Sequence, residues 1–325
     1  MNILHKKNAF GGKILALCGG VGGAKLAWGL AQTLSPEQLT IVVNTGDDFE
    51  HLGLHISPDL DTVMYTLAGI NNRELGWGLA GETWNCMETL ESLGGESWFR
   101  LGDKDLATHV LRTQQLAQGK TLTAVTAHLC KKLGIHHRVL PMSDNAVRTL
   151  IDTNEGELAF QDYFVRQQCK PAVLGVRFTG TETATLSPEV LAVLNDPDLR
   201  AVIICPSNPL LSIAPILAVQ GMKEALQKAT LKKTPAKIIV VSPLIGGQAV
   251  KGPTAKMMQE INIPTDSNSI ADFYAGLLDV LVIDESDQKD ADSFSSADFS
   301  VHACKTLMKT DADKLALATS LLQLI

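Results

Sequence analysis

The segment GGVGGAKL, residues 19–26, has the composition of a phosphate-binding loop. Glycine lacks a Cβ atom, so backbone N–H groups can approach phosphate oxygens, and Lys25 can neutralise phosphate charge. The segment fits neither common motif, because Ala24 and Leu26 replace the Gly and Ser/Thr of Walker A, and the Gly-x-Gly-x-x pattern ends in Lys25. An ordinary NTPase or dehydrogenase is therefore not indicated, and a tight turn for close strand-helix packing is the alternative interpretation.

Two acidic segments follow this loop in the sequence. In NTGDDFEH, Asn44 comes just after an apolar run and is a candidate binding residue, and Asp47 and Asp48 supply carboxylates. In SPDLDT, Asp59 and Asp61 precede a helical pattern. Such carboxylates can bind ribose hydroxyls or a divalent metal, but an Asx turn explains the first segment equally, and one aspartate of the second could cap a helix while the other is functional.

Further polar residues occupy two later segments. Arg100, in FRLGDKDLATH, precedes a turn and can reach a phosphate or a polar heterocycle. The segment CPSNPLLSIAP follows an apolar run, and its hydroxyl and amide groups can bind phosphate or a base without adding charge. Its candidate binding residues are Ser207, Asn208, Pro209 and Ser212. Because prolines also set turns and end helices, a purely structural role remains open for this segment.

The elements that must position these residues alternate between strands and helices. Apolar runs predict strands at 13–18, 40–43, 138–140, 172–176, 201–205, 237–241 and 279–283. Most are separated by helical patterns, and residues 24–34 carry apolar side chains at helical spacing, so residues 19–23 should form the strand-to-helix turn. The pattern predicts an α/β fold, a Rossmann-like, doubly wound, mostly parallel sheet, whose ligands bind at the carboxyl ends of the strands.

The strand signal disappears between residues 71 and 137, where helical patterns take over, notably over 104–118 and 121–133. We therefore predict a nucleotide-binding core at 1–70 and 138–325, with a helical cap inserted at 71–137. The cap could close over the ligand edge of the sheet. Residues 286–298 are polar and predict an exposed connection.

Composition limits the function classes. The chain has 325 residues, 45% of them hydrophobic, and 28 Lys+Arg against 35 Asp+Glu give a net charge of -7. A broad nucleic-acid surface is therefore not expected, and small molecules are the expected partners. The six cysteines form no C-x-x-C pair, and no apolar stretch reaches the length of a membrane span. We expect a cytoplasmic protein with reduced thiols and no membrane contact.

Taken in order, the motifs resemble the 2-phospho-L-lactate transferases, which act in the biosynthesis of the deazaflavin coenzyme F-420. The resemblance runs through GGVGGAKL, NTGDD, SPDLDTVMYTLAG, WGLAGETW, RLGDKDLATH, LPMSDN, FQDYFV, PSNPLLSI, SPLIGG, KGPTAKMM and LVIDESD. It covers nearly the whole chain. It implies an enzyme that moves a phospho-three-carbon-acid group from a guanosine diphospho donor to the ribityl hydroxyl of 7,8-didemethyl-8-hydroxy-5-deazariboflavin, releasing GMP.

The resemblance also implies roles for particular residues. The resemblance implies that Asp61 and Arg100 contact the deazaflavin and that the PSNP segment, residues 206–209, contacts the guanosine. It implies that Asp47, Asp48 or Asp61 binds magnesium. One of these aspartates would be the general base for the acceptor hydroxyl. The diphosphate falls on Lys25 and on the loop residues Gly19, Gly20, Val21, Gly22 and Gly23. The implied catalytic residues are Asp61, Asp48 and Lys25, and dimeric relatives suggest a homodimer.

The glycine segment departs from the archaeal pattern GGTGTPKL, since Val21, Gly23 and Ala24 replace Thr, Thr and Pro. It resembles the bacterial members, so the donor's acid stays open among 2-phospholactyl, phosphoenolpyruvyl and 3-phosphoglyceryl. A non-catalytic, nucleotide-sugar-binding regulator of the same superfamily is the alternative function. A nicotinamide oxidoreductase is disfavoured by the broken glycine pattern and by the absence of a placed hydride-transfer residue.

Overall fold

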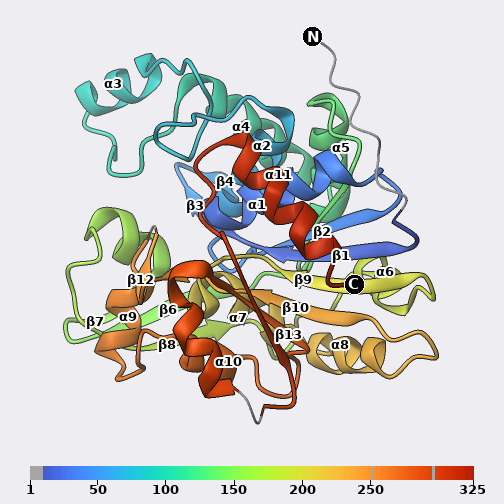
Figure 1. The fold of residues 1–325 in the computed structure, drawn as a ribbon. Helices are drawn as coiled ribbons and strands as arrows, with labels where there is room; N and C mark the ends of the chain where they lie inside the picture. Colours follow the sequence, from blue (N-terminus) through green and yellow to red (C-terminus); the bar gives the residue numbers. More distant parts are fainter. Residues whose placement is uncertain (1–9, 251, 295–296) are drawn as a thin grey trace.

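The structure is a computed structural model that describes residues 10–250, 252–294 and 297–325. The first nine residues of the predicted core and Lys251, which opens the KGPTAKMM segment, lie outside the described residues. Seven parallel strands form the central sheet in the order β14-β13-β10-β9-β1-β2-β5 (Figure 1). They are β1 (Lys13–Cys18), β2 (Leu39–Val43), β5 (Arg138–Pro141), β9 (Leu199–Ile204), β10 (Lys237–Val241), β13 (Val280–Asp284) and β14 (Ser300–Cys304).

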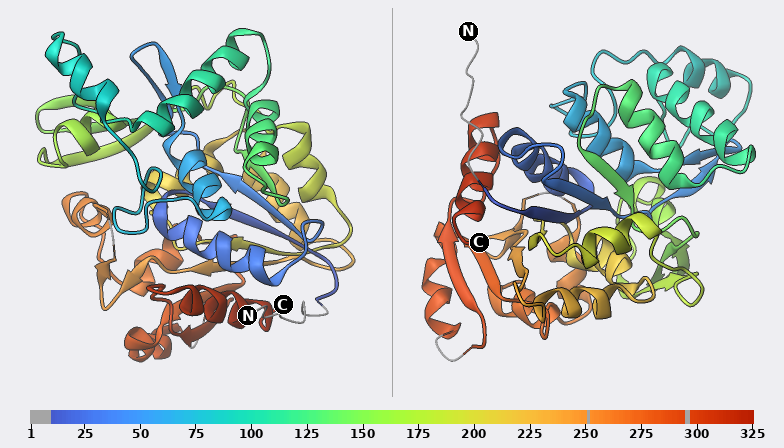
Figure 2. Two further views of the ribbon diagram at one scale, coloured as in Figure 1. Left: turned by 90° about the horizontal axis from the view of Figure 1, so that it is seen from above. Right: turned by 90° about the vertical axis from the view of Figure 1, so that its right-hand side faces the viewer.

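Helices cover both faces of this sheet, as the continuous apolar runs of its inner strands require. Five consecutive residues of β1, from Ile14 to Cys18, are fully buried, so both faces of that strand need a covering layer. One face packs against α1 (Gly20–Thr33), α2 (Pro58–Ala68), α5 (Leu122–Lys132) and α11 (Asp311–Leu322). The other packs against α6 (Pro188–Asn195), α7 (Ala214–Ala218), α8 (Met222–Thr230) and α10 (Ser267–Phe273). Figure 2 shows these two layers on either side of the strands, and the predicted doubly wound α/β fold is confirmed.

Six of the seven predicted strands lie in the central sheet. The prediction at 172–176 corresponds to β8 (Val173–Thr179), which belongs instead to a separate antiparallel sheet of order β7-β6-β8, with β6 (Arg148–Thr153) and β7 (Gly156–Ala159). The strand β14 was not predicted, because it is an edge strand whose residues are only half-buried and carry little apolar signal. Within the predicted polar connection at 286–298, the residues up to Phe294 belong to a ten-residue 3-10 helix, η3 (Glu285–Phe294).

The glycine segment is helical sooner than predicted. Helix α1 begins at Gly20, so the prediction of a turn through residue 23 was wrong. Glycine disfavours a helix because of its backbone freedom, but here the missing Cβ atoms permit contacts that stabilise the turn. A Cβ atom on Gly22 would lie 2.3 Å from the backbone oxygen of Pro206, and one on Gly23 would lie 2.6 Å from Ser207 Oγ. Gly20 has φ +61°, which few other residues adopt.

The order of the strands places a crevice at the carboxyl ends of β1 and β9. From β1 the chain passes through α1 to β2 on one side, whereas β9 pairs with the opposite edge of β1, with Leu17 opposite Ile204. Helices on opposite faces therefore leave the sheet at this point, which is where open α/β sheets bind ligands. The glycine segment follows β1, and the PSNP segment follows β9.

Within residues 71–137 the structure forms three helices: α3 (Asn85–Ser92), α4 (Asp103–Ala117) and α5. Figure 1 shows α3 at the outer edge of the molecule, whereas Val125 and Leu129 of α5 pack into the main core. A β-hairpin that was not predicted, β3 (Phe49–His51) and β4 (Leu54–Ile56), packs against α3 and α4 through Ile56 and Met87. In the part of the chain that the structure describes, no helix is long and apolar enough to cross a membrane.

The remaining elements lie around the crevice or close to it. They are the π-helical turns η1 (Asp162–Arg166) and η2 (Pro209–Ile213), the short hairpin β11 (Leu244–Ile245) and β12 (Gln248–Ala249), and α9 (Thr254–Glu260).

Candidate active site

A cavity of about 500 Å³ opens at the carboxyl ends of β1 and β9. Its walls come from the start of α1, the start of α2, residues 99–101 of the cap, η1, the PSNP segment and residues 306–308. Gly20 and Asp61 both line it, so the first glycine segment and the second acidic segment face one shared space.

The start of α1 presents backbone N–H groups to this cavity. Gly19, Gly20, Val21 and Gly22 line the cavity, whereas Gly23 packs against Cys18 and Ser207 below it. Ser207 fixes the turn, because its Oγ donates to the Gly19 oxygen at 2.8 Å and accepts from the Gly19 N–H at 3.2 Å. Unpaired N–H groups and the helix dipole make such a helix start attractive to anions.

Lys25 lines the cavity one turn further along α1. Its Nζ donates to the backbone oxygen of Met308 at 2.9 Å. This contact holds the ammonium group at the cavity wall formed by residues 306–308. The lysine can therefore add positive charge beside the N–H groups of the helix start.

Asp59 lies against the glycine segment and was not selected from the sequence as a binding residue. Its Oδ1 accepts the Gly20 N–H at 2.7 Å, and its Oδ2 accepts from Asn44 Nδ2 at 3.0 Å. Asn44 is fully buried, donates also to the Leu211 oxygen, and accepts the Gly46 N–H, so it braces Asp59 from behind and does not itself line the cavity.

Asp47 lines the cavity together with Asp59, and the two carboxyls have raised pKa values. Burial, and next the charge of Asp59, raise the pKa of Asp47 well above its usual value. Burial raises the pKa of Asp59 to about 6, against the hydrogen bonds from Asn44 and Gly20. Among the described residues, no lysine or arginine forms an ion pair with either carboxylate. Buried carboxylates that face one cavity are ligands of the kind that a hard cation prefers.

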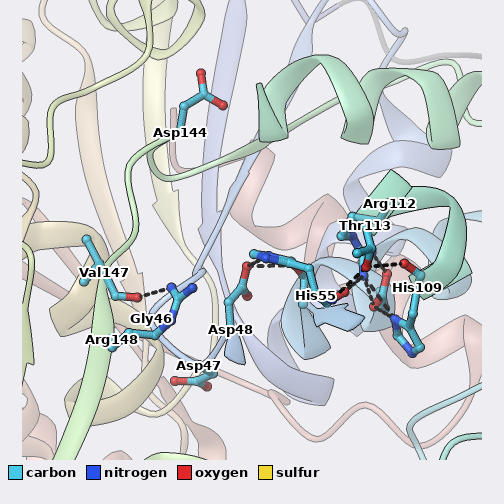
Figure 3. A network of polar contacts seen from close by, with 12 residues as sticks. Gly46, Asp47, Asp48, His55, His109, Arg112, Thr113, Asp144, Val147 and Arg148 are labelled. Carbon is cyan, nitrogen blue, oxygen red and sulfur yellow. Dashed lines mark hydrogen bonds and ion pairs between the residues drawn. The ribbon is translucent and has the colours of Figure 1, made fainter. Parts of the chain in front are cut away.

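Asp48 points away from its neighbour Asp47, as Figure 3 shows. Its Oδ2 accepts from Ser57 Oγ at 2.7 Å and lies 3.1 Å from His55 Nε2. It does not line the cavity. The structure thus separates two aspartates that are adjacent in the sequence.

Asp61 belongs to a buried polar network on the inner wall of the cavity. Both of its oxygens accept from the guanidinium of Arg112, on α4. His109 Nδ1 lies 3.7 Å from Asp61 Oδ2, and His109 Nε2 lies 3.4 Å from Asp105 Oδ2. The hydroxyl of Tyr65 donates to Asp105 Oδ1 at 2.6 Å. Burial raises the pKa of Asp61, although the charge of Arg112 opposes this shift.

Three members of this network have the composition of a metal site. Asp61, Asp105 and His109 are buried and offer ligand atoms within 4.8 Å of one another, so they could hold a metal ion. Asp105 and His109 belong to the FRLGDKDLATH segment, from which only Arg100 was selected as a binding residue, and Arg112 follows three residues later. The spacing of four and then three residues puts Asp105, His109 and Arg112 on one face of α4, and charged residues along a buried helix face were the available signal.

The remaining predicted residues lie at the mouth and on the β9 side of the cavity. Arg100 lines the mouth, and its guanidinium lies 4.8 Å from the ring centre of Trp84. Ser207, Asn208 and Ser212 line the β9 side, whereas Pro209 begins η2 and is buried away from the cavity. Asn208 Oδ1 accepts the N–H groups of residues 210 and 211 at 2.9 and 3.2 Å, and its buried Nδ2 has no partner among the described residues.

The fold and the cavity are those of an α/β protein with a candidate ligand site at the crossover point of its sheet. The family model described as 2-phospho-L-lactate transferase CofD matches residues 14–319. The chain belongs to this family, which is a family of transferases.

Relatives with two different names are equally similar to the chain. A 2-phospho-L-lactate transferase of Methanosarcina mazei is 38% identical over 312 residues, covering 95% of this chain and 99% of the relative. A phosphoenolpyruvate transferase of Streptomyces coelicolor is also 38% identical over 312 residues, covering 94% of this chain and 95% of the relative. Among solved structures, a member of the UPF0052 family from Bacillus halodurans shares the fold with a TM-score of 0.61 at 13% identity, covering 96% of this chain and 99% of that one.

Proposed function

We propose that the protein transfers a phospho-three-carbon-acid group from a guanosine diphospho donor to the ribityl hydroxyl of the deazaflavin acceptor in coenzyme F-420 biosynthesis. The acceptor oxygen forms a bond to the phosphorus that carries the acid, the bridging bond to GMP breaks, and the hydroxyl proton passes to a carboxylate. The observation that carries this proposal is the shared cavity, where the glycine segment and Asp61 face each other. An in-line attack needs donor and acceptor in one such space.

The two sides of the cavity suit the two substrates. The N–H groups of Val21 and Gly22 and the ammonium of Lys25 would bind the diphosphate, because the Gly20 N–H is already taken by Asp59. Ser207 fixes the turn that presents them. Asn208 and Ser212 would face the guanosine, where the unpaired Asn208 Nδ2 offers a donor to a ligand oxygen. On the opposite wall, Arg100 and Asp61 would contact the acceptor.

The family resemblance implies magnesium, and the carboxylates of the cavity fit a hard cation. Asp47 and Asp59 are the preferred ligands, because both are buried in the cavity wall and neither has an ion-pair partner among the described residues. Asp48 does not line the cavity, and the charge of Asp61 is already balanced by the guanidinium of Arg112, which disfavours both as ligands. When bound, Mg²⁺ would neutralise charge on the phosphate oxygens.

Asp61 would receive the proton of the acceptor hydroxyl. It lies in the cavity wall, its carboxylate is held by Arg112, and burial raises its pKa, which strengthens it as a base. Among the predicted catalytic residues, Lys25 would act on the phosphate. Asp48 would act only indirectly, through His55 and Ser57.

The identity of the three-carbon acid stays open, because relatives named for phospholactate and for phosphoenolpyruvate are equally similar. No observation favours the non-catalytic regulator. We also propose a cytoplasmic homodimer with a cap at 71–137. The location is supported by six free cysteines, and the dimer rests on the resemblance alone.

The test is a coupled measurement of both products. The purified protein is incubated with the deazaflavin, Mg²⁺ and each of the three guanosine donors in parallel, and GMP and the heavier deazaflavin are quantified by mass spectrometry. We expect one-to-one formation of both products with at least one donor, and none without acceptor. Tight nucleotide binding with no release of GMP would instead identify a regulator.

A further inference from the structure

One arginine lies at the centre of the polar network behind the cavity. Arg112 is 1% exposed, and its two Nη groups donate to the two oxygens of Asp61. Its Nη1 also reaches the backbone oxygen of His55 at 3.4 Å. A guanidinium is planar and matches a carboxylate with two parallel hydrogen bonds, so this pairing fixes both the position and the rotation of the Asp61 side chain.

Arg112 also fixes the hydrogen-bonding role of His109. Its Nη1 lies 3.2 Å from His109 Nδ1, and because a guanidinium has only donors, Nδ1 must accept. The ring proton is then on Nε2, which faces Asp105 Oδ2 at 3.4 Å. The other oxygen of Asp105 accepts from Tyr65. The arginine therefore sets the tautomer of His109 and places the ring proton on the side of Asp105, although Nε2 forms no hydrogen bond among the described residues.

The same guanidinium contacts two of the three residues, Asp61, Asp105 and His109, that could hold a metal ion. Two of the three candidate ligands already accept hydrogen bonds from Arg112, and the fixed positive charge of Arg112 would repel a metal ion bound between them. The arginine supplies the positive charge that a metal would otherwise bring.

We propose that Arg112 is a positioning residue that holds the Asp61 carboxylate toward the cavity, where it accepts a hydrogen bond from a ligand hydroxyl. In the group formed by Asp61, Asp105 and His109, the guanidinium of Arg112 then takes the place of a metal ion, and the group binds no metal. The identity of that hydroxyl, on the acceptor, rests on the proposed function. The arginine itself touches no substrate.

The kinetic test separates acceptor from donor. In Arg112→Gln we expect the KM for the deazaflavin to rise about tenfold or more, since a bidentate charged contact is lost, while the KM for the donor changes by less than about twofold. Arg112→Lys should be intermediate, because it keeps the charge but loses the fork. The matched control is Arg177→Gln, which removes a similar bidentate pair with Asp152 on the surface and should leave both constants unchanged.

Loss of Arg112 leaves a buried carboxylate unpaired, which can impair folding. The double variant Asp61→Asn/Arg112→Gln removes both charges and keeps polar side chains at both positions. Because both residues act through one carboxylate, the double variant should lose no more acceptor affinity than Asp61→Asn alone. The positioning role would be overturned if the losses of acceptor affinity in the two single variants multiplied in the double variant, or if the KM values for donor and acceptor rose together.

Metal binding gives a readout that does not require turnover. Titration of the wild type and of His109→Gln with Mn²⁺, followed by electron paramagnetic resonance, should give affinities within about twofold of each other, whereas loss of a true ligand typically costs about tenfold or more. Such a loss would overturn the inference that Asp61, Asp105 and His109 bind no metal. If the wild type forms no product, the proposed function fails. The Mn²⁺ comparison still tests this inference, as does a crystal structure of Arg112→Gln, in which the Asp61 carboxylate should turn away from the cavity.

Discussion

The substitution Asp59→Asn tests the buried carboxylate that lies against the glycine segment. The amide oxygen can still accept the Gly20 N–H, which Asp59 accepts at 2.7 Å. The amide nitrogen, however, would face Asn44 Nδ2, a donor that now contacts Asp59 Oδ2 at 3.0 Å. We expect this lost contact to destabilise the fold by about 1 kcal/mol at any pH.

The charge of Asp59 has a larger effect, which depends on pH. Burial raises its pKa from 3.8 to about 6 in the folded protein. Because the folded state holds the proton more tightly than the unfolded state, the stability from Asp59 is full below about pH 4, is lost as the pH rises to about 6, and then stays constant. The loss corresponds to about 3 kcal/mol. The variant should therefore be less stable than the wild type near pH 4 and about 2 kcal/mol more stable near pH 7.5.

Urea unfolding of both proteins at these two pH values, without divalent metal, measures this reversal. The control is Asp152→Asn, on the surface, where hydrogen bonding with Arg177 lowers the pKa of the carboxyl. Its effect has the opposite sign, because stability from Asp152 is lost as the pH falls. A stability difference between Asp59→Asn and the wild type that is the same at both pH values would refute the buried-carboxylate reasoning.

Mg²⁺ provides a second arm of the same assay. At about ten times its Kd, a metal that binds only the folded state adds about 1.4 kcal/mol. We expect this gain near pH 7.5 in the wild type and not in Asp59→Asn. An equal gain in both proteins would place the metal away from Asp59.

Three further predictions concern the cavity walls. Gly22→Ala places a Cβ atom 2.3 Å from the Pro206 oxygen, so we expect a loss of about 1 to 3 kcal/mol in thermal unfolding together with weaker GDP binding by calorimetry. Lys25→Met should weaken GDP binding by about tenfold, with a smaller dependence on salt, whereas unchanged affinity would place the diphosphate elsewhere. Arg166, whose guanidinium lies 4.4 Å from the Trp98 ring centre, ties η1 to the cap, so Arg166→Ala should increase amide hydrogen exchange at residues 96–101 and leave that of β1 unchanged.

The sequence alone determined the sheet class and the side of the sheet that carries the site. The apolar run of β1, the glycines after it and the helical spacing behind them lie within a short window of the chain, where local propensity and burial pattern act. The same holds for the apolar runs of β9 and β10. Strand ends of a parallel sheet meet at one edge, so the motifs after β1 and β9 could be placed together without coordinates.

Only the tertiary structure decided which carboxylates share the cavity. Asp47 and Asp48 are adjacent in the sequence, yet Ser57 and His55 draw Asp48 away from the cavity. Asp59 proved to face the glycine segment, although its sequence context also fits a helix start. These outcomes depend on side-chain packing between elements, which a local pattern does not encode.

The pairing of Asp61 with Arg112 also depends on packing between elements, here between segments that are far apart in the sequence. The two residues are 51 positions apart, and neither the SPDLDT segment nor the helix pattern of α4 contains information about the other. The edge strand β14 and the strand β8 show the same limit for the backbone, because the choice of sheet depends on which edge is free once the core has assembled. Short-range sequence determines which elements form, whereas the partners of a buried charge are set by the chain segments that burial brings together.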